Sequence, residues 1–226
     1  MNLPASVDVP GGTASSAALR TLTVEVFFDF VCPWCLIGKR HLGAAVRMLA
    51  EQRPDVRLEV VWRPHALLPD TPMAGLPYQS FYVARLGSPE AVSMRRAQVQ
   101  QAGAAAGVQF AFDRIQVLPN TAKAHARVAR IRPGQRAGLI DRIFTAYFQE
   151  GEDIGDGAVL ERLALECQSD SEVQAGEMAA AETEGPAPAH YPIPGVPFFV
   201  VNGSLALSGA MPPEALLDLM LRALDA

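Results

Sequence analysis

The first third of the chain alternates between strand-like and helix-like hydrophobic patterns. Residues 23–30 are rich in β-branched and aromatic side chains, as in a buried strand. Apolar positions then recur at helical spacing over residues 36–49, with Lys39 and Arg40 expected to face solvent. A second strand pattern covers residues 56–62. A strand, a helix and a strand within about forty residues predict a parallel βαβ unit with a right-handed crossover.

The middle of the chain is predominantly helical in its periodicity. Six segments have helical spacing of apolar residues, namely 78–86, 89–106, 120–131, 135–148, 157–167 and 171–184. Helix-start chemistry supports several of them, for example Ser88 before Pro89 and Asn120 before Thr121. Residues 186–194 then form a proline-stiffened, extended connector.

The C-terminal part returns to strands. Two apolar runs, 197–201 and 205–207, flank Asn202-Gly203, a strong short-range signal for a β-hairpin. An amphipathic helix is expected over residues 214–224. The two ends together give the order β-α-β, a helical insertion, then β-β-α, which is an α/β fold.

Composition narrows the class of protein. Half of the 226 residues are apolar, which is enough for a full core, and the net charge of −5 without a basic cluster argues against a nucleic-acid partner. Residues 1–22 resemble a flexible leader rather than a secretory signal, and no apolar run approaches the roughly 20 residues needed to span a bilayer. We therefore expect a cytoplasmic protein, in which paired cysteines tend to be catalytic or redox-sensing.

The candidate chemistry is a Cys-Pro-Trp-Cys motif at the junction between the first strand and the first helix. Cys32 falls at or near the helix N-cap, and Pro33 suits the first turn, where its missing N–H costs nothing. Unpaired N–H groups and the helix dipole favour a thiolate at Cys32. Cys35 lies almost one turn further along the same face, close enough to form a disulfide. The motif in this position predicts a redox pair.

Two other roles for the cysteine pair are weaker. A zinc site needs two further ligands, but only Cys167 and four separated histidines remain, without metal-binding spacing. A purely structural disulfide would close a very short loop and constrain the unfolded chain little. Cys167 itself lies among leucines and is expected to be a buried, inert thiol.

Several motifs together resemble the DsbA family of thiol–disulfide oxidoreductases, in particular its FrnE-like branch. They lie at 29–40 (DFVCPWCLIGKR), 120–125 (NTAKAH), 146–151 (AYFQEG), 195–199 (GVPFF) and 208–210 (SGA). The likeness covers roughly residues 23–224 and implies a thioredoxin-like fold (βαβ–ββα) with an all-helical insertion. The expected division is a leader at 1–22, a thioredoxin-like core at 23–65 and 191–226, and a helical insertion domain at 66–190.

The resemblance also implies the composition of the site. Pro197 is expected to be in the cis form and to lie beside the cysteine pair, which leaves the backbone of Val196 free to pair with an extended substrate. Trp34, between the cysteines, is a candidate docking surface. His125 and Asn120 lie on an insertion helix that is expected to face the site, although an ordinary helix cap is the simpler role for Asn120.

The expected reaction is disulfide exchange, in which Cys32 is the nucleophile and Cys35 resolves the mixed disulfide. Asp29, three residues before Cys32, is a candidate for moving the proton of Cys35. No metal or cofactor is expected, and glutathione is a possible co-substrate beside protein or small-molecule thiols. The motif does not give the direction of exchange, the natural substrate or whether the protein is a monomer or a homodimer.

Two other functions stay open. 2-Hydroxychromene-2-carboxylate isomerases and kappa-class glutathione transferases have the same architecture, but a serine replaces the cysteine pair, so the presence of Cys32 and Cys35 argues against that chemistry. A redox-gated chaperone or partner-binding protein would use the apolar cleft without turnover.

Overall fold

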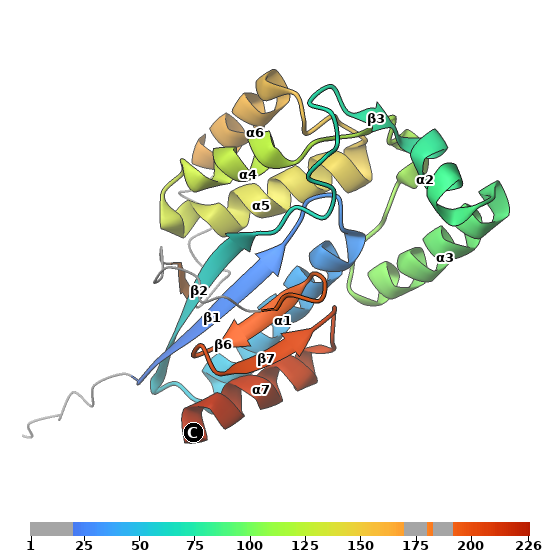
Figure 1. Ribbon diagram of the computed structural model, residues 1–226. Coiled ribbons are helices and arrows are strands. Elements are labelled where there is room, and N and C mark those ends of the chain that lie inside the picture. The colour runs from blue at the N-terminus through green and yellow to red at the C-terminus, as the bar shows by residue number, and fades with distance from the viewer. Residues whose placement is uncertain (1–19, 170–179, 183–191) are drawn as a thin grey trace, which may run out of the picture.

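The computed structural model describes residues 20–169, 180–182 and 192–226, and a five-stranded sheet forms its centre (Figure 1). The strands are β1 (Arg20–Phe28), β2 (Val56–Pro64), β5 (Ala180–Glu182), β6 (Phe198–Val201) and β7 (Leu205–Ser208), in the order β5-β2-β1-β6-β7. β1, β2 and β5 are parallel, whereas β6 and β7 are antiparallel to their neighbours. The predicted βαβ unit and C-terminal hairpin are confirmed.

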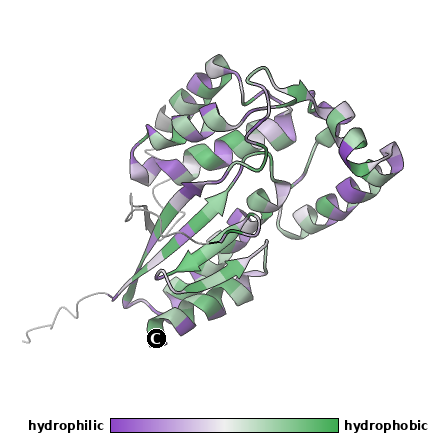
Figure 2. Cartoon of the chain, in the orientation of Figure 1, coloured by the Kyte–Doolittle hydropathy of each residue, from purple (hydrophilic) through white to green (hydrophobic). Residues whose placement is uncertain are grey.

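Two helices complete the thioredoxin-like part of the fold. α1 (Pro33–Gln52) connects β1 to β2, and α7 (Pro213–Asp225) follows β7. The two helices contact each other and share the large apolar core with Leu22, Val24 and Val26, which alternate along β1. The strands are predominantly hydrophobic in Figure 2, as expected for a sheet that is largely buried.

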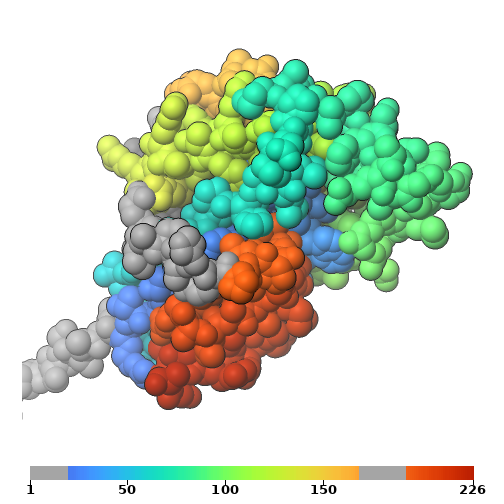
Figure 3. Space-filling view, in the orientation of Figure 1, coloured from blue at the N-terminus to red at the C-terminus, as the bar shows by residue number. Residues whose placement is uncertain are grey.

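The insertion consists of two groups of helices. α2 (Tyr78–Leu86) and α3 (Pro89–Ala105) contact each other, and so do α4 (Ala122–Ala129), α5 (Arg136–Thr145) and α6 (Gly157–Ser169). The α2–α3 pair projects from the body of the molecule (Figures 1 and 3). A short ladder of β3 (Leu76–Pro77) and β4 (Val117–Leu118) connects the two groups along the chain.

Some predicted boundaries differ from the structure. The predicted leader extended to residue 22, but β1 already begins at Arg20, whose N–H donates to Asp55 O at 3.0 Å. The helix predicted over 171–184 is wrong for residues 180–182, which form β5 at the edge of the sheet within the predicted insertion. Alanine favours helices, so a short edge strand containing two alanines gives no strand signal. Residues 1–19, most of the predicted helix, and His190 lie outside the described residues.

Lys39 is buried, so the expectation that it faces solvent is wrong. Its Nζ lies 2.6 Å from Oδ2 of Asp141 on α5 and 5.5 Å from the centre of the Trp62 ring. Arg40 is half exposed and lies 3.3 Å from the other carboxylate oxygen of Asp141. The insertion contacts α1 at this point, and helical periodicity alone does not show where another helix will dock. A partly buried ion pair therefore connects the insertion to the core.

Candidate active site

The cysteine pair occupies the start of α1, as predicted. Cys32 is the N-cap residue with extended backbone angles, and Pro33 opens the helix. The N–H of Cys32 donates to the carbonyl of Asp29 at 3.2 Å, and the N–H of Cys35 donates to the carbonyl of Cys32 at 3.0 Å. Both thiols are free. The turn after β1 thus fixes Cys32 at the positive end of a helix 20 residues long.

The two thiols have different surroundings. Cys32 is 5% exposed and lines a cavity, whereas Cys35 is 2% exposed and does not. Burial raises the pKa of Cys35 well above its ordinary value, and a hydrogen bond to Cys32 and the charges of Cys32 and Asp29 raise it further. Cys35 therefore keeps its proton at neutral pH.

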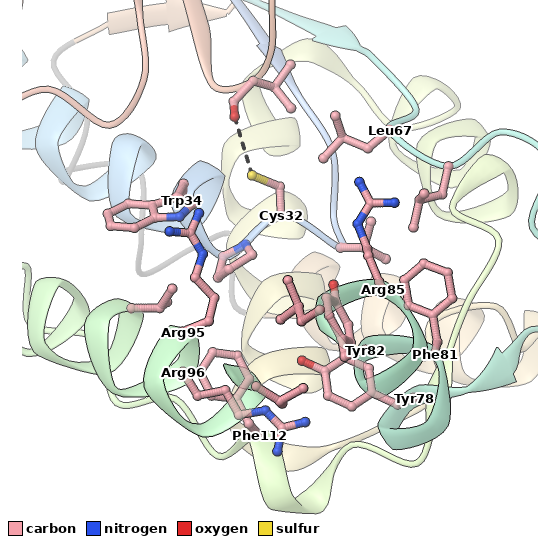
Figure 4. A pocket seen from close by; sticks show the side chains of 17 residues that line it. Cys32, Trp34, Leu67, Tyr78, Phe81, Tyr82, Arg85, Arg95, Arg96 and Phe112 are labelled. Carbon is pink, nitrogen blue, oxygen red and sulfur yellow. Dashed lines mark hydrogen bonds between the residues drawn. The ribbon is translucent and has the colours of Figure 1, made fainter. Parts of the chain in front are cut away.

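A loop with a cis proline lies against Cys32. The Val196–Pro197 peptide bond is cis, the isomer that the resemblance implies. The thiol of Cys32 donates to the carbonyl of Val196, with 3.5 Å between sulfur and oxygen (Figure 4). Val196 lines the same cavity as Cys32. The cis-proline loop and Cys32 therefore form one side of the cavity together.

Gly38 allows this loop to approach α1 closely. A Cβ atom added at Gly38 would lie 2.8 Å from Cγ of Pro197 and 3.3 Å from the Phe199 ring. Gly38 was not among the site residues predicted from the sequence. The available signal was a glycine inside a helical pattern, where glycine costs up to about 1 kcal/mol relative to alanine.

A cavity of about 370 Å³ opens beside Cys32, between the start of α1 and the α2–α3 pair (Figure 4). Trp34, the candidate docking surface, lies on one side of it. The other lining residues are Val31, Pro33, Leu67, Leu68, Tyr78, Phe81, Tyr82, Arg85, Leu86, Val92, Arg95, Arg96, Val99 and Phe112. Most of these side chains are apolar or aromatic, which is typical of a small-molecule or peptide site.

The α2 and α3 residues of the cavity were missed by the sequence analysis. On α2 they follow the spacing of one helix face, with Tyr78, Phe81, Tyr82 and Arg85 at positions i, i+3, i+4 and i+7. This face was visible as a periodic pattern, but the pattern does not indicate which surface it faces. Burial raises the pKa of Tyr82 to about 12 and that of Tyr78 further, so both hydroxyls stay protonated donors at neutral pH.

His125 does not line the cavity and instead contacts Asp29. Nε2 of His125 lies 3.2 Å from Oδ1 of Asp29, and the imidazole packs against Phe28 and Phe30 with ring centres 5.2 and 4.9 Å away. The other oxygen of Asp29 accepts from the N–H of Leu67 at 2.8 Å. Leu67 lines the cavity, so the Asp29–His125 pair fixes the backbone on one side of it.

Asn120 also lies outside the cavity lining. Its Nδ2 donates to the carbonyl of Thr71 at 2.6 Å, and its Oδ1 accepts from the N–H of Ala122 at 3.0 Å. Asn120 therefore joins the start of α4 to the chain segment that follows Leu68. The structure thus brings the cysteine pair together with Trp34, Val196 and Pro197. His125, through Asp29, and Asn120 instead contact the segment of residues 67–71.

Neither a metal-binding cluster nor a membrane-spanning helix occurs in residues 20–169, 180–182 and 192–226. No group of three or more histidine, cysteine or acidic residues that could hold a metal ion occurs there. No helix in these ranges combines the length and apolar character needed to cross a membrane.

Comparison with known families decides the classification. The DsbA-like thioredoxin domain model matches residues 23–221. The chain belongs to this family. Among curated proteins, the uncharacterized protein YwbO of Bacillus subtilis (strain 168) is 28% identical over 147 residues, which are 65% of this chain and 66% of YwbO. The match thus covers just under two thirds of that relative.

Solved structures show the same fold at low sequence identity. The probable DsbA oxidoreductase SCO1869 of Streptomyces coelicolor is 22% identical, with a TM-score of 0.70 and 90% of each chain covered. A putative protein disulfide isomerase of Nitrosomonas europaea is 18% identical, with a TM-score of 0.58, over 91% of this chain and 98% of that one. The cytosolic disulfide reductase DsbM of Pseudomonas aeruginosa, with GSH, is 19% identical, with a TM-score of 0.54, over 88% and 99%.

Proposed function

We propose that this chain is a thiol–disulfide oxidoreductase whose redox pair is Cys32 and Cys35, with Cys32 as the nucleophile. The observation that supports this most directly is the difference between the thiols: Cys32 lines the cavity beside the cis-proline loop, and Cys35 is buried with a raised pKa. An attacking sulfur that lines the cavity and a protonated second thiol behind it are what stepwise disulfide exchange requires.

The exchange proceeds in two balanced steps. The Cys32 thiolate attacks one sulfur of a substrate disulfide, so that a mixed disulfide forms and one substrate thiolate leaves and takes up a proton. Cys35 then loses its proton and attacks the Cys32 sulfur, which releases the second substrate thiol and leaves a Cys32–Cys35 disulfide. The reverse sequence oxidises a substrate dithiol. The negative charge of Asp29 helps to keep Cys35 protonated until the second step.

Trp34 and Val196 are the proposed substrate contacts, because both line the cavity beside Cys32. Pro197 is buried against Gly38, and its proposed role is to hold Val196 in this position. His125 and Asn120 are assigned a positioning role instead. His125 contacts Asp29, which accepts from the N–H of Leu67, and Asn120 donates to the carbonyl of Thr71. The similarity to a cytosolic disulfide reductase described with GSH supports a cytoplasmic location and glutathione as a co-substrate.

The experiment compares reduction of insulin and of glutathione disulfide by the wild type and by Cys32→Ser, with Cys167→Ser as the control. Activity should be lost in Cys32→Ser and retained in Cys167→Ser. Disulfide exchange that survives Cys32→Ser would contradict the proposal. Conjugation of glutathione to 1-chloro-2,4-dinitrobenzene without disulfide exchange would place the chain with the transferases. Binding of insulin without reduction of its disulfides would favour the chaperone or partner-binding function.

A further inference from the structure

The cavity beside Cys32 carries a concentration of positive charge. Arg85, Arg95 and Arg96 line it, and none of its lining residues in the described part of the chain is acidic. The protein as a whole has a net charge of −5. The charge around the candidate nucleophile is therefore opposite in sign to the charge of the molecule.

Arg96 is the arginine with a structural role. It donates to Oε1 of Gln79 at 2.6 Å, and its guanidinium lies 5.3 and 5.7 Å from the ring centres of Tyr78 and Phe112. It also lies 3.8 Å from the carboxylate of Asp113. These contacts connect α2 with α3 and the segment that follows it, and they offset the charge of Arg96.

Arg85 and Arg95 are available to a ligand. Both are exposed. Arg95 lies over the Trp34 ring at 5.9 Å and donates only to the neutral Gln98, at 2.7 Å. The side chain of Arg85, near the end of α2, forms no hydrogen bond or ion pair with any residue that the structure describes. In Figure 4 the two guanidinium groups lie on opposite sides of Cys32.

We propose that Arg85 and Arg95 select small disulfides that carry carboxylate groups. This inference rests on the proposed function and names the substrate class of the same site. Guanidinium groups bind carboxylates through paired, charge-assisted hydrogen bonds, and Arg95 is held in place by its stacking on Trp34. With one guanidinium on each side of the attacking Cys32 sulfur, both halves of a symmetrical anionic disulfide find a partner.

The site favours a small disulfide over a polypeptide. The cavity volume of about 370 Å³ is at the lower end of the range for small-molecule sites, and the aromatic side chains of α2 leave apolar surface for the methylene groups between sulfur and carboxylate. The positive charges also offset the repulsion between the Cys32 thiolate and an incoming anion.

The test measures single-turnover oxidation of the reduced protein by three disulfides with two-carbon arms. These are the anionic 3,3′-dithiodipropionate, the neutral bis(2-hydroxyethyl) disulfide and the cationic cystamine. Each rate constant is divided by that for the same disulfide with free dithiothreitol, which removes differences in intrinsic reactivity. The expected order is anionic, then neutral, then cationic, and the preference should shrink as the salt concentration rises.

Variants identify the residues responsible. Arg85→Gln and Arg95→Gln should each lower the normalised rate for the anionic disulfide by roughly two- to fivefold, as for an exposed ion pair, without changing the neutral one. Arg47→Gln, on the exposed side of α1 and outside the cavity lining, is the control and should leave all three rates unchanged.

Equal normalised rates for the anionic and neutral disulfides would overturn the inference, as would the same loss in Arg47→Gln. A disulfide in an acidic polypeptide much longer than glutathione that reacts much faster than dithiodipropionate would overturn the small-molecule assignment. Failure of all three disulfides to oxidise a protein that still reduces insulin would also overturn the inference. Failure with insulin as well would instead contradict the proposed function.

Discussion

At the scale of single residues, one turn of helix separates two thiols with different chemistry. Cys32 caps α1 and lines the cavity, whereas Cys35 lies inside the core against Cys32 and Asp29. The motif could be found in the sequence because its position between a strand and a helix was visible there. The degree of burial of Cys35 could not be predicted from the sequence, since it depends on the packing of the whole core.

The raised pKa of Cys35 predicts a pH dependence of stability. Above about pH 8.5 an unfolded thiol loses its proton, whereas the native Cys35 keeps it. The native state then binds more protons than the unfolded state, so the free energy of unfolding of the reduced protein should fall as the pH rises. Urea unfolding at pH 7.5 and 9.5 under reducing conditions measures this fall, which should be smaller in Cys35→Ala. An equal fall in both proteins would contradict the prediction.

Gly38 gives a second prediction at this scale. Gly38→Ala should destabilise the protein by about 1–3 kcal/mol, because the added methyl group would displace Pro197. The control is Gly43→Ala in the same helix, where the nearest atom to an added Cβ is 3.8 Å away and alanine should be neutral or stabilising. Denaturant unfolding compares the two variants. A Gly38→Ala protein as stable as Gly43→Ala would show that the loop does not need this close approach.

At the scale of elements, a few specific contacts dock the insertion on the core. Phe144 of α5 packs against Phe28 and Phe30 at the end of β1, with ring centres 6.2 and 5.1 Å apart. The Lys39–Asp141 ion pair joins α1 to α5. These contacts place the helical insertion beside the cysteine pair.

The ion pair is tested by removing one partner. Asp141→Ala should lower the free energy of unfolding by about 1–3 kcal/mol, because it leaves the buried Lys39 without its partner, whereas Lys39→Met should cost less since it removes the buried charge. Asp218→Ala breaks an exposed pair with Arg222 and should change stability by less than about 1 kcal/mol. Denaturant unfolding of the three variants gives the comparison. If Lys39→Met is as damaging as Asp141→Ala, the loss comes from packing rather than from an unpaired charge.

The sequence predicted most elements but not their mutual arrangement. Strands with β-branched residues, the Asn202-Gly203 hairpin and most of the helices were readable, because local periodicity reports burial on one face. β5 could not be predicted, since its three residues form a strand by pairing with β2 and not by their own conformational preference. Arg85 and Arg95 were missed for a related reason, because the surface that an amphipathic helix faces is fixed only by tertiary packing.

At the scale of the whole molecule, the site lies at the boundary between two parts of the fold. The thioredoxin-like core supplies Cys32, Cys35 and the cis-proline loop, and the insertion supplies the aromatic and basic side chains opposite them. The α2–α3 pair projects beside the core (Figure 3). In the proposed function, the core therefore provides the exchange chemistry, and the insertion provides the surface that a substrate meets.

Trapping of a mixed disulfide tests the central claim most directly. In Cys35→Ala, a disulfide substrate should form a stable covalent adduct on Cys32, because the thiol that would resolve it is absent. In Cys32→Ala, the buried, protonated Cys35 should react far more slowly. Mass spectrometry of peptides from both variants, after exposure to the same disulfide, locates the adduct. An adduct on Cys32 in the first variant alone is the predicted result, and equal or faster labelling of Cys35 in the second would contradict the account.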